Sequence, residues 1–147
     1  MLLSISTEAV LKQVYALSAL RSMLTSTPDS VSPYLTEDNR QALIPILNEA
    51  LSYIAAELLP YLEIVTPPST LDDLIEAELT VDNLPAGICS MMESALAQRM
   101  LHIIHSLTPG NTGDNYRAMA DTVLQTLLTI IRESAGASTG SIPWNGY

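Results

Sequence analysis

Apolar residues recur at the three-to-four-residue spacing of an amphipathic helix in four segments of the chain. Each segment is bounded by residues that start or stop helices, such as Thr7 before the first segment and Pro109-Gly110 after the third. The predicted helices cover residues 7–24, 36–62, 85–107 and 114–134, with Gly136 as the C-cap of the last. The pattern therefore predicts an all-α domain, an antiparallel bundle of about four helices.

The second predicted helix is unusually long. Thr36 is a plausible N-cap before Glu37 and Asp38, and Pro67-Pro68 closes the segment. Pro45 lies inside the pattern and removes one backbone donor, so we expect a kink there. Some 27 residues would reach about 40 Å, against a radius of gyration of about 15 Å for a domain of this size. Such a helix is expected to project or to pack against a neighbouring molecule.

Residues 69–83 break the helical pattern and form an acidic connecting arm. Residues 76–81 read equally well as an alternating strand or as part of a short helix, so the structure of the arm stays open. The arm contains no basic residue, and its five acids are Asp72, Asp73, Glu76, Glu78 and Asp82. It is interpreted as a solvated arm or as a face that meets a basic partner.

The C-terminal residues 137–147 are small and polar around an isolated Pro143-Trp144. We predict a helical domain over residues 1–136, followed by a flexible tail that folds only on a partner. Pro143, Trp144 and the terminal Tyr147 are the candidate contact residues of this tail. Met91 and Met92 are two further candidates, because adjacent methionines cannot both lie in one narrow apolar stripe of a helix.

Charge narrows the choice of partners. The 147 residues include 16 acids and 6 bases, a net charge of −10, which argues against direct binding of nucleic acid. Only 15% of residues are charged, compared with about 25% in a typical soluble domain. The longest uncharged runs have 14 residues, too few to span a bilayer, and no signal peptide is visible. With Cys89 as the single cysteine, these features predict a reduced, intracellular chain.

Catalytic and cofactor-binding motifs are not found in the sequence. His102 and His105 are spaced i, i+3 on one helical face, but the Glu-x-x-His of di-iron bundles and the His-Glu-x-x-His of zinc proteases are both absent. No nucleophile elbow or phosphate-binding loop is present either. We therefore expect no enzymatic activity, no cofactor and no metal. A metal-dependent helical enzyme that uses the two histidines is the weakest alternative.

Four stretches carry a resemblance to a known class of proteins. They are Ile5 to Leu11, Leu35 to Asn39 leading into residues 43–62, Leu79 to Val81 with Leu84-Pro85, and Asn115 to Arg132 before the tail. In this order the chain resembles small helical structural proteins of tailed phages and prophages, particularly of Bacteroides-type hosts, and more loosely the head–tail connector (adaptor) family. Its last helix and tail carry only Arg117 and Arg132 as basic residues, fewer than those relatives.

The resemblance implies a non-enzymatic virion building block that forms a ring beside the portal. Such a protein is made in the bacterial cytoplasm and is then built into the virion, and its acidic arm or C-terminal tail would reach the neighbouring component. The resemblance implies no catalytic residues and no membrane contact. The alternative function is a cytoplasmic bacterial adaptor or regulatory protein whose acidic surface binds one basic protein.

Overall fold

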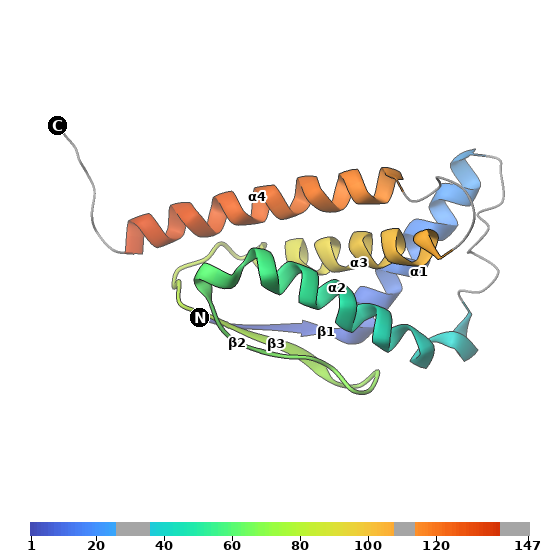
Figure 1. Ribbon diagram of the computed structural model, residues 1–147, viewed down its shortest axis with the longest axis horizontal. Coiled ribbons are helices and arrows are strands. Elements are labelled where there is room, and N and C mark those ends of the chain that lie inside the picture. The colour runs from blue at the N-terminus through green and yellow to red at the C-terminus, as the bar shows by residue number, and fades with distance from the viewer. Residues whose placement is uncertain (26–35, 108–113, 139–147) are drawn as a thin grey trace.

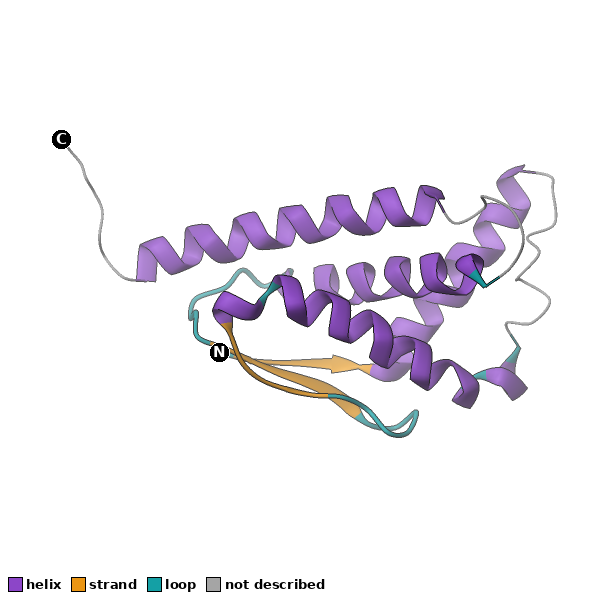
Figure 2. Cartoon of the chain, in the orientation of Figure 1, coloured by secondary structure: helices purple, strands orange, loops and turns teal. Residues whose placement is uncertain are grey.

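The computed structural model describes residues 1–25, 36–107 and 114–138, which form four α-helices, three short 3-10 helices and one small sheet (Figure 2). In chain order the elements are β1 (Leu2–Ser6), α1 (Thr7–Thr25), η2 (Glu37–Asn39), η3 (Gln41–Leu43), α2 (Ile44–Glu57), η4 (Leu59–Tyr61), β2 (Leu62–Thr66), β3 (Leu74–Leu79), α3 (Ile88–Ser106) and α4 (Asp114–Ser138). The fold is mostly helical, as predicted, but the sheet means that it is not purely all-α.

Three of the predicted helices are confirmed as α1, α3 and α4, although α3 begins at Ile88 and not at Pro85. The predicted end of α4 was wrong, because the helix continues through Gly136 to Ser138. Gly136 lies between Ala135 and Ala137, two strong helix formers, and a Cβ added to it would meet nothing within 4 Å. The predicted tail of residues 137–147 therefore begins inside α4, and residues 139–147 lie outside the described residues.

The predicted 27-residue helix over residues 36–62 is wrong. Pro45 does not kink a helix but lies in the first turn of α2, where a missing N–H costs nothing. The 14 residues of α2 span about 21 Å and end at Glu57, before a 3-10 turn that contains Pro60. The chain then continues as β2 through the β-branched run Ile64 to Thr66. No long projecting helix is formed in this segment.

A three-stranded antiparallel sheet replaces part of the predicted connecting arm. Its strand order is β1-β3-β2, so β3, the most acidic strand, lies in the centre. The pairing aligns Ile5 with Ile75, and Ala77 with both Leu3 and Val65. These side chains form the inner face of the sheet, which the helices cover, while the opposite face is open (Figure 1). Alternation along residues 76–81 therefore reports a strand, which ends at Leu79.

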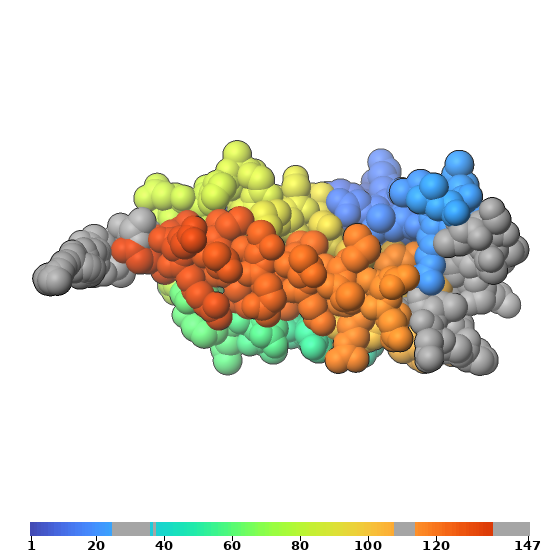
Figure 3. Space-filling view, turned by 90° about the horizontal axis from the view of Figure 1, so that it is seen from above, coloured from blue at the N-terminus to red at the C-terminus, as the bar shows by residue number. Residues whose placement is uncertain are grey.

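Helix α3 is the centre of the core. Every residue from Ala95 to Leu101 is buried, and α1, α2, α4 and β1 all pack against the helix (Figure 1). Seen from above, α4 runs along the length of the molecule, with α2 visible along one side (Figure 3). The apolar surface that the sequence left on α3 is therefore covered on several sides by the chain's own elements.

Candidate protein-binding surfaces

The five acids of the predicted arm do not form one cluster. Glu76 and Glu78 lie on the open face of the sheet, and Asp72 and Asp82 lie exposed before and after β3. Glu78 and Asp82 are near the N-terminal ammonium, at 3.6 and 3.4 Å respectively. The predicted acidic partner site is thus spread along β3 and its two ends.

Asp73 stabilises the loop between β2 and β3 through hydrogen bonds to its backbone. Its Oδ2 accepts hydrogen bonds from the backbone N–H groups of Ser69 (2.8 Å) and Thr70 (3.0 Å), and these bonds lower the pKa of the carboxyl group. The Asp73 carbonyl oxygen accepts a hydrogen bond from the buried Thr7 hydroxyl at 2.7 Å. Asp73 therefore fixes the loop and joins it to the start of α1.

The open sheet face combines acidic and apolar side chains. Leu2 of β1 and Ile64 of β2 are both paired with Glu78 of β3 and are 54% and 65% exposed. Leu74, at the start of β3, is 50% exposed on the same face, and Glu76 lies between it and Glu78. Apolar residues that flank two carboxylates on an uncovered sheet are a candidate contact surface for a basic partner.

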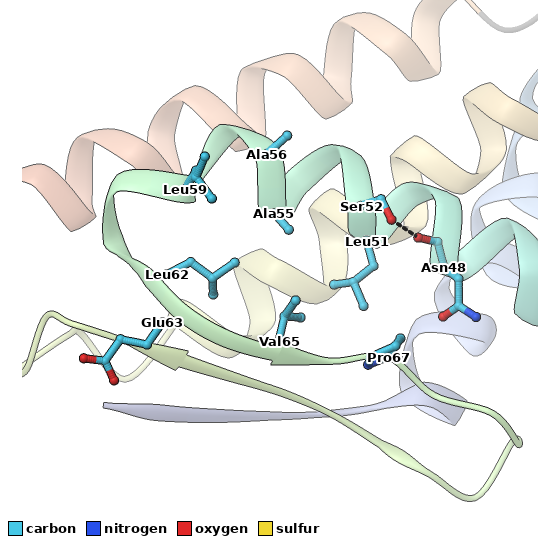
Figure 4. A pocket seen from close by; sticks show the side chains of 10 residues that line it. All are labelled: Asn48, Leu51, Ser52, Ala55, Ala56, Leu59, Leu62, Glu63, Val65 and Pro67. Carbon is cyan, nitrogen blue, oxygen red and sulfur yellow. Dashed lines mark hydrogen bonds between the residues drawn. The ribbon is translucent and has the colours of Figure 1, made fainter.

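A groove opens between α2 and β2, with a volume of about 660 Å³ (Figure 4). Leu62 and Val65 point from β2 toward the helix, and Leu51 and Ala55 point back toward the strand, while Glu63 points away at the mouth (Figure 4). The remaining lining residues are Asn48, Ser52, Ala56, Leu59 and Pro67. The small alanine side chains on α2 leave the space open, so the groove offers an apolar floor beside an exposed strand edge.

One buried polar atom lies at this groove. The Asn48 side chain donates from Nδ2 to the Pro68 carbonyl oxygen at 3.3 Å, but its buried Oδ1 accepts no hydrogen bond. A buried acceptor without a donor is costly, by about 1–3 kcal/mol. A donor brought by an occupant of the groove could satisfy this atom.

The groove and strands β2 and β3 belong to a segment without basic residues. No Lys, Arg or His occurs between Arg40 and Arg99. The nine acids in this segment are Glu49, Glu57, Glu63, Asp72, Asp73, Glu76, Glu78, Asp82 and Glu93. The N-terminal ammonium, beside Glu78 and Asp82, is the one cation that the described residues bring to these acids, so the net charge here stays negative and favours cationic partners.

The two predicted methionines occupy different environments. Met92 is 2% exposed and belongs to the core, whereas Met91 is half-buried and lines a smaller hollow of about 310 Å³ between α3 and α4. The hydroxyls of Thr122 and Thr126, on the α4 side of this hollow, donate to backbone carbonyl oxygens of α4 itself. Met91 is therefore the one of the pair that a partner could reach in this conformation.

The histidines lie in the packed region between α3 and α4. His105 is buried and stacks on Tyr116 with ring centroids 5.3 Å apart, while His102 is half-buried. Burial and the nearby Arg99 and Arg117 lower the pKa of His102, against the opposing carboxylates of α4. Among the residues that the structure describes, no three His, Cys, Asp or Glu side chains come together as metal ligands.

Arg99 is a buried cation in the same region. Its side chain is 4% exposed, donates to Oδ1 of Asp121 at 2.6 Å, and lies over the ring of Tyr53 at 3.9 Å from the centroid. The arrangement neutralises a charge that α3 would otherwise bury alone. We interpret Arg99 as part of the packing between α2, α3 and α4.

A second apolar surface lies at the C-terminal end of α1. Leu20, Met23 and Leu24 are spaced i, i+3, i+4, so they share one face of the helix, and they are 49%, 78% and 75% exposed. We call these three residues the α1 end. It lies toward the opposite end of the molecule from the start of β2 (Figure 1).

The remaining predicted contact residues, Pro143, Trp144 and Tyr147, lie outside the described residues. Sequence reasoning missed β1, β2 and the groove. Two signals could have found the strands: the alternation of Leu3 and Ile5 with serines, and the run Ile64-Val65-Thr66 between prolines. The groove has no local signal, because it depends on how far α2 lies from β2.

Comparison of the chain with protein-family models, with curated proteins and with solved structures finds no match. None of the helices in the described ranges combines the length and apolar character needed to cross a membrane.

Proposed function

We propose that this chain is a non-enzymatic structural protein that assembles with copies of itself, of the head–tail connector type found in tailed phages. In this proposal it is made in the bacterial cytoplasm and takes its place in the virion as a ring next to the portal. The resemblance of residues 5–11, 79–85 and 115–132 supports the phage assignment, whereas the long helix expected over residues 36–62, which was also part of the resemblance, is not formed.

The observation that carries the proposal is the α1 end. Met23 and Leu24 are about three-quarters exposed on one helical face, together with Leu20. Monomeric soluble proteins mostly expose such residues singly, whereas a contiguous apolar face is typical of an interaction site. A closed ring needs two different, complementary surfaces on each subunit, and the α1 end would supply one of them.

The test is the mass of the protein in solution as a function of concentration, followed by negative-stain imaging. We expect oligomers that grow with concentration and ring-shaped particles. The double variant Met23→Lys/Leu24→Lys should shift the protein to monomer, because it places two like charges in the apolar contact. A matched control, Gln125→Lys/Thr129→Lys, adds the same charge on exposed positions of α4 and should leave the oligomer intact.

A strict monomer at every soluble concentration, with and without a portal protein, would contradict the proposal. A portal or capsid gene next to the coding sequence would support the phage assignment independently.

The second candidate function is a cytoplasmic adaptor that binds one basic protein. It is favoured by the absence of basic residues between Arg40 and Arg99. The two functions differ in stoichiometry, because the adaptor would bind its partner as a monomer and form no ring.

A further inference from the structure

We propose that the outer edge of β2 and the groove beside it bind an extended, basic segment of a partner protein, which adds to the sheet as a fourth strand. This deepens the proposed function by naming the chemistry of the neighbouring component. Binding itself requires only the monomer, so the two proposals can fail separately.

The backbone of β2 provides the first argument. Within the described residues β2 pairs only with β3, so the groups along its other edge have no strand partner. An edge of this kind is a template for an added strand, and main-chain hydrogen bonds then supply affinity. Helix α2 runs beside the edge, so an added strand would lie between solvent and the groove (Figure 4).

The groove provides the second argument. Successive side chains of an added strand point to opposite faces of the sheet, and those on the inner face would enter the groove. There they would meet Leu51, Ala55 and Val65, in a space of about 660 Å³. This volume lies within the range of ligand pockets, about 300–1,000 Å³, so the groove can take apolar side chains. The occupant should therefore be apolar at alternate positions.

The charge of the open face provides the third argument. The other side chains of the added strand would lie beside Ile64 and Thr66, which are paired with Glu78 and Glu76. A strand beyond β2 is about 10 Å from β3, within reach of a Lys or Arg side chain. Glu63 adds a carboxylate at the mouth of the groove. The positions that alternate with the apolar ones should therefore be basic.

The same charges disfavour other occupants. A second copy pairing through its own β2 would bring Glu63 and the two acidic sheet faces together, which is unfavourable between neighbouring strands. Residues 139–147 of the chain include no Lys or Arg, so they do not complement the acidic face either.

The test uses four labelled synthetic peptides and fluorescence anisotropy with the full chain. They are an alternating Val-Lys hexapeptide, an alternating Val-Glu hexapeptide, a peptide of the first composition with its three valines grouped, and the sequence of residues 139–147. We expect the alternating Val-Lys peptide to bind at least about tenfold more tightly than the other three. Equal binding of the grouped peptide, or tighter binding of the Val-Glu peptide or of residues 139–147, would overturn the proposal.

Charge reversal sharpens the test. Glu63→Lys/Glu76→Lys changes two exposed carboxylates and should reverse the preference, weakening the Val-Lys peptide about tenfold and strengthening the Val-Glu peptide. Glu133→Lys, on an exposed turn of α4, is the control and should change neither affinity. An unchanged preference in the double variant contradicts the proposed site.

A substitution that fills the groove tests separately whether the groove takes part in peptide binding. Ala56 lines the groove from an exposed position, so Ala56→Trp should fold normally and abolish peptide binding. Ala118→Trp makes the same change on an exposed position of α4 and should bind like the unmodified chain. Undiminished binding by a folded Ala56→Trp protein counts against the groove.

Amide hydrogen exchange distinguishes strand addition from other docking. The bound Val-Lys peptide should slow the exchange of amides within residues 62–66, and unchanged exchange there would overturn the proposal. The same experiments on the Met23→Lys/Leu24→Lys chain show whether binding survives in the monomer. Peptide binding without a ring would leave this inference standing and contradict the proposed assembly.

Discussion

The middle of α3 and the edge strand β2 are both rich in apolar residues, but the rest of the chain covers them to different extents. Residues 95–101 of α3 are buried on all sides, and this enclosure includes Gln98 and Arg99. Strand β2 is covered on one face and along one edge, and Ile64 remains 65% exposed. In this chain, an element's apolar content does not tell whether it belongs to the core or to a contact surface.

The middle of α3 and the region around β2 also differ in how their charged side chains are paired. On α3 the single cation Arg99 is matched by one carboxylate and one aromatic ring, so no net charge faces the core. Around β2, Glu63 and Glu76 face solvent without a basic side chain from the same segment, and Glu78 has only the N-terminal ammonium of β1 near it, at 3.6 Å. The charge of Arg99 is compensated inside the fold, whereas the carboxylates of Glu63 and Glu76 beside β2 remain exposed to solvent and to a partner.

The largest expected effect on the free energy of unfolding is that of a cavity in the core. Leu96 of α3 is fully buried, so Leu96→Ala should lower the free energy of unfolding by about 3 kcal/mol. Ile64→Ala on β2 removes an exposed side chain and should cost less than about 1 kcal/mol. Equilibrium urea unfolding measures both. Equal losses of unfolding free energy would mean that Ile64 is as enclosed as Leu96, contrary to the difference in burial between β2 and α3.

A smaller effect is expected at the ion pair of α3. Asp121→Asn removes the charged partner of a buried guanidinium and should cost about 1–2 kcal/mol, since Asp121 is half-exposed. Glu63→Gln, the matched change at the edge of β2, should stay within about 0.5 kcal/mol. Urea unfolding of the double variant Arg99→Met/Asp121→Asn is the control, and it should recover stability relative to Asp121→Asn. No recovery would show that the loss arises elsewhere.

The smallest effect is a pH dependence with separate windows for the two regions. The pKa of His102 on α3 is lowered by burial and by Arg99, so the folded state favours the neutral ring and the unfolded state takes up a proton first. Stability should therefore fall as the pH drops below about 6.5. Asp73, beside β2, has a lowered pKa because backbone N–H groups bind its carboxylate, so its contribution is lost only below about pH 4.

Thermal unfolding from pH 8 to pH 3 checks this order. The variant His102→Gln should lose the decline in stability near neutral pH. The variant Asp73→Asn should show a weaker decline in stability at acidic pH. If His102→Gln left the upper decline unchanged, another group would be responsible for it.

Three helices were predictable because their signals are local and repeated. Along α1, α3 and α4 the apolar spacing recurs over 19 residues or more, so a single exception does not hide it. Pro45 was not decisive, because a proline fits both a kinked helix and a first turn, and the choice depends on what precedes it. Strands of five residues, such as β1 and β2, offer too few positions for a clear alternation.

The candidate sites were predictable only in part. The sequence shows that residues 69–83 are acidic, and the structure places two of these acids, Glu76 and Glu78, on the open sheet face. That Asp73 instead fixes a loop follows from backbone N–H groups that only the folded turn brings to it. In the sequence, Met91 and Met92 are equivalent candidates. In the structure, Met92 of α3 lies in the core and Met91 is half-buried.

The amino-acid sequence is sufficient to establish the helical character, the acidic charge and its concentration between Arg40 and Arg99, because these depend on residue type and local spacing. Tertiary structure decided which apolar surfaces are covered. Strand β1 pairs with β3 across about seventy residues of chain, and α3 is enclosed by elements from both ends of the sequence. Burial depends on such distant segments packing together, and no local pattern of residues records where they meet.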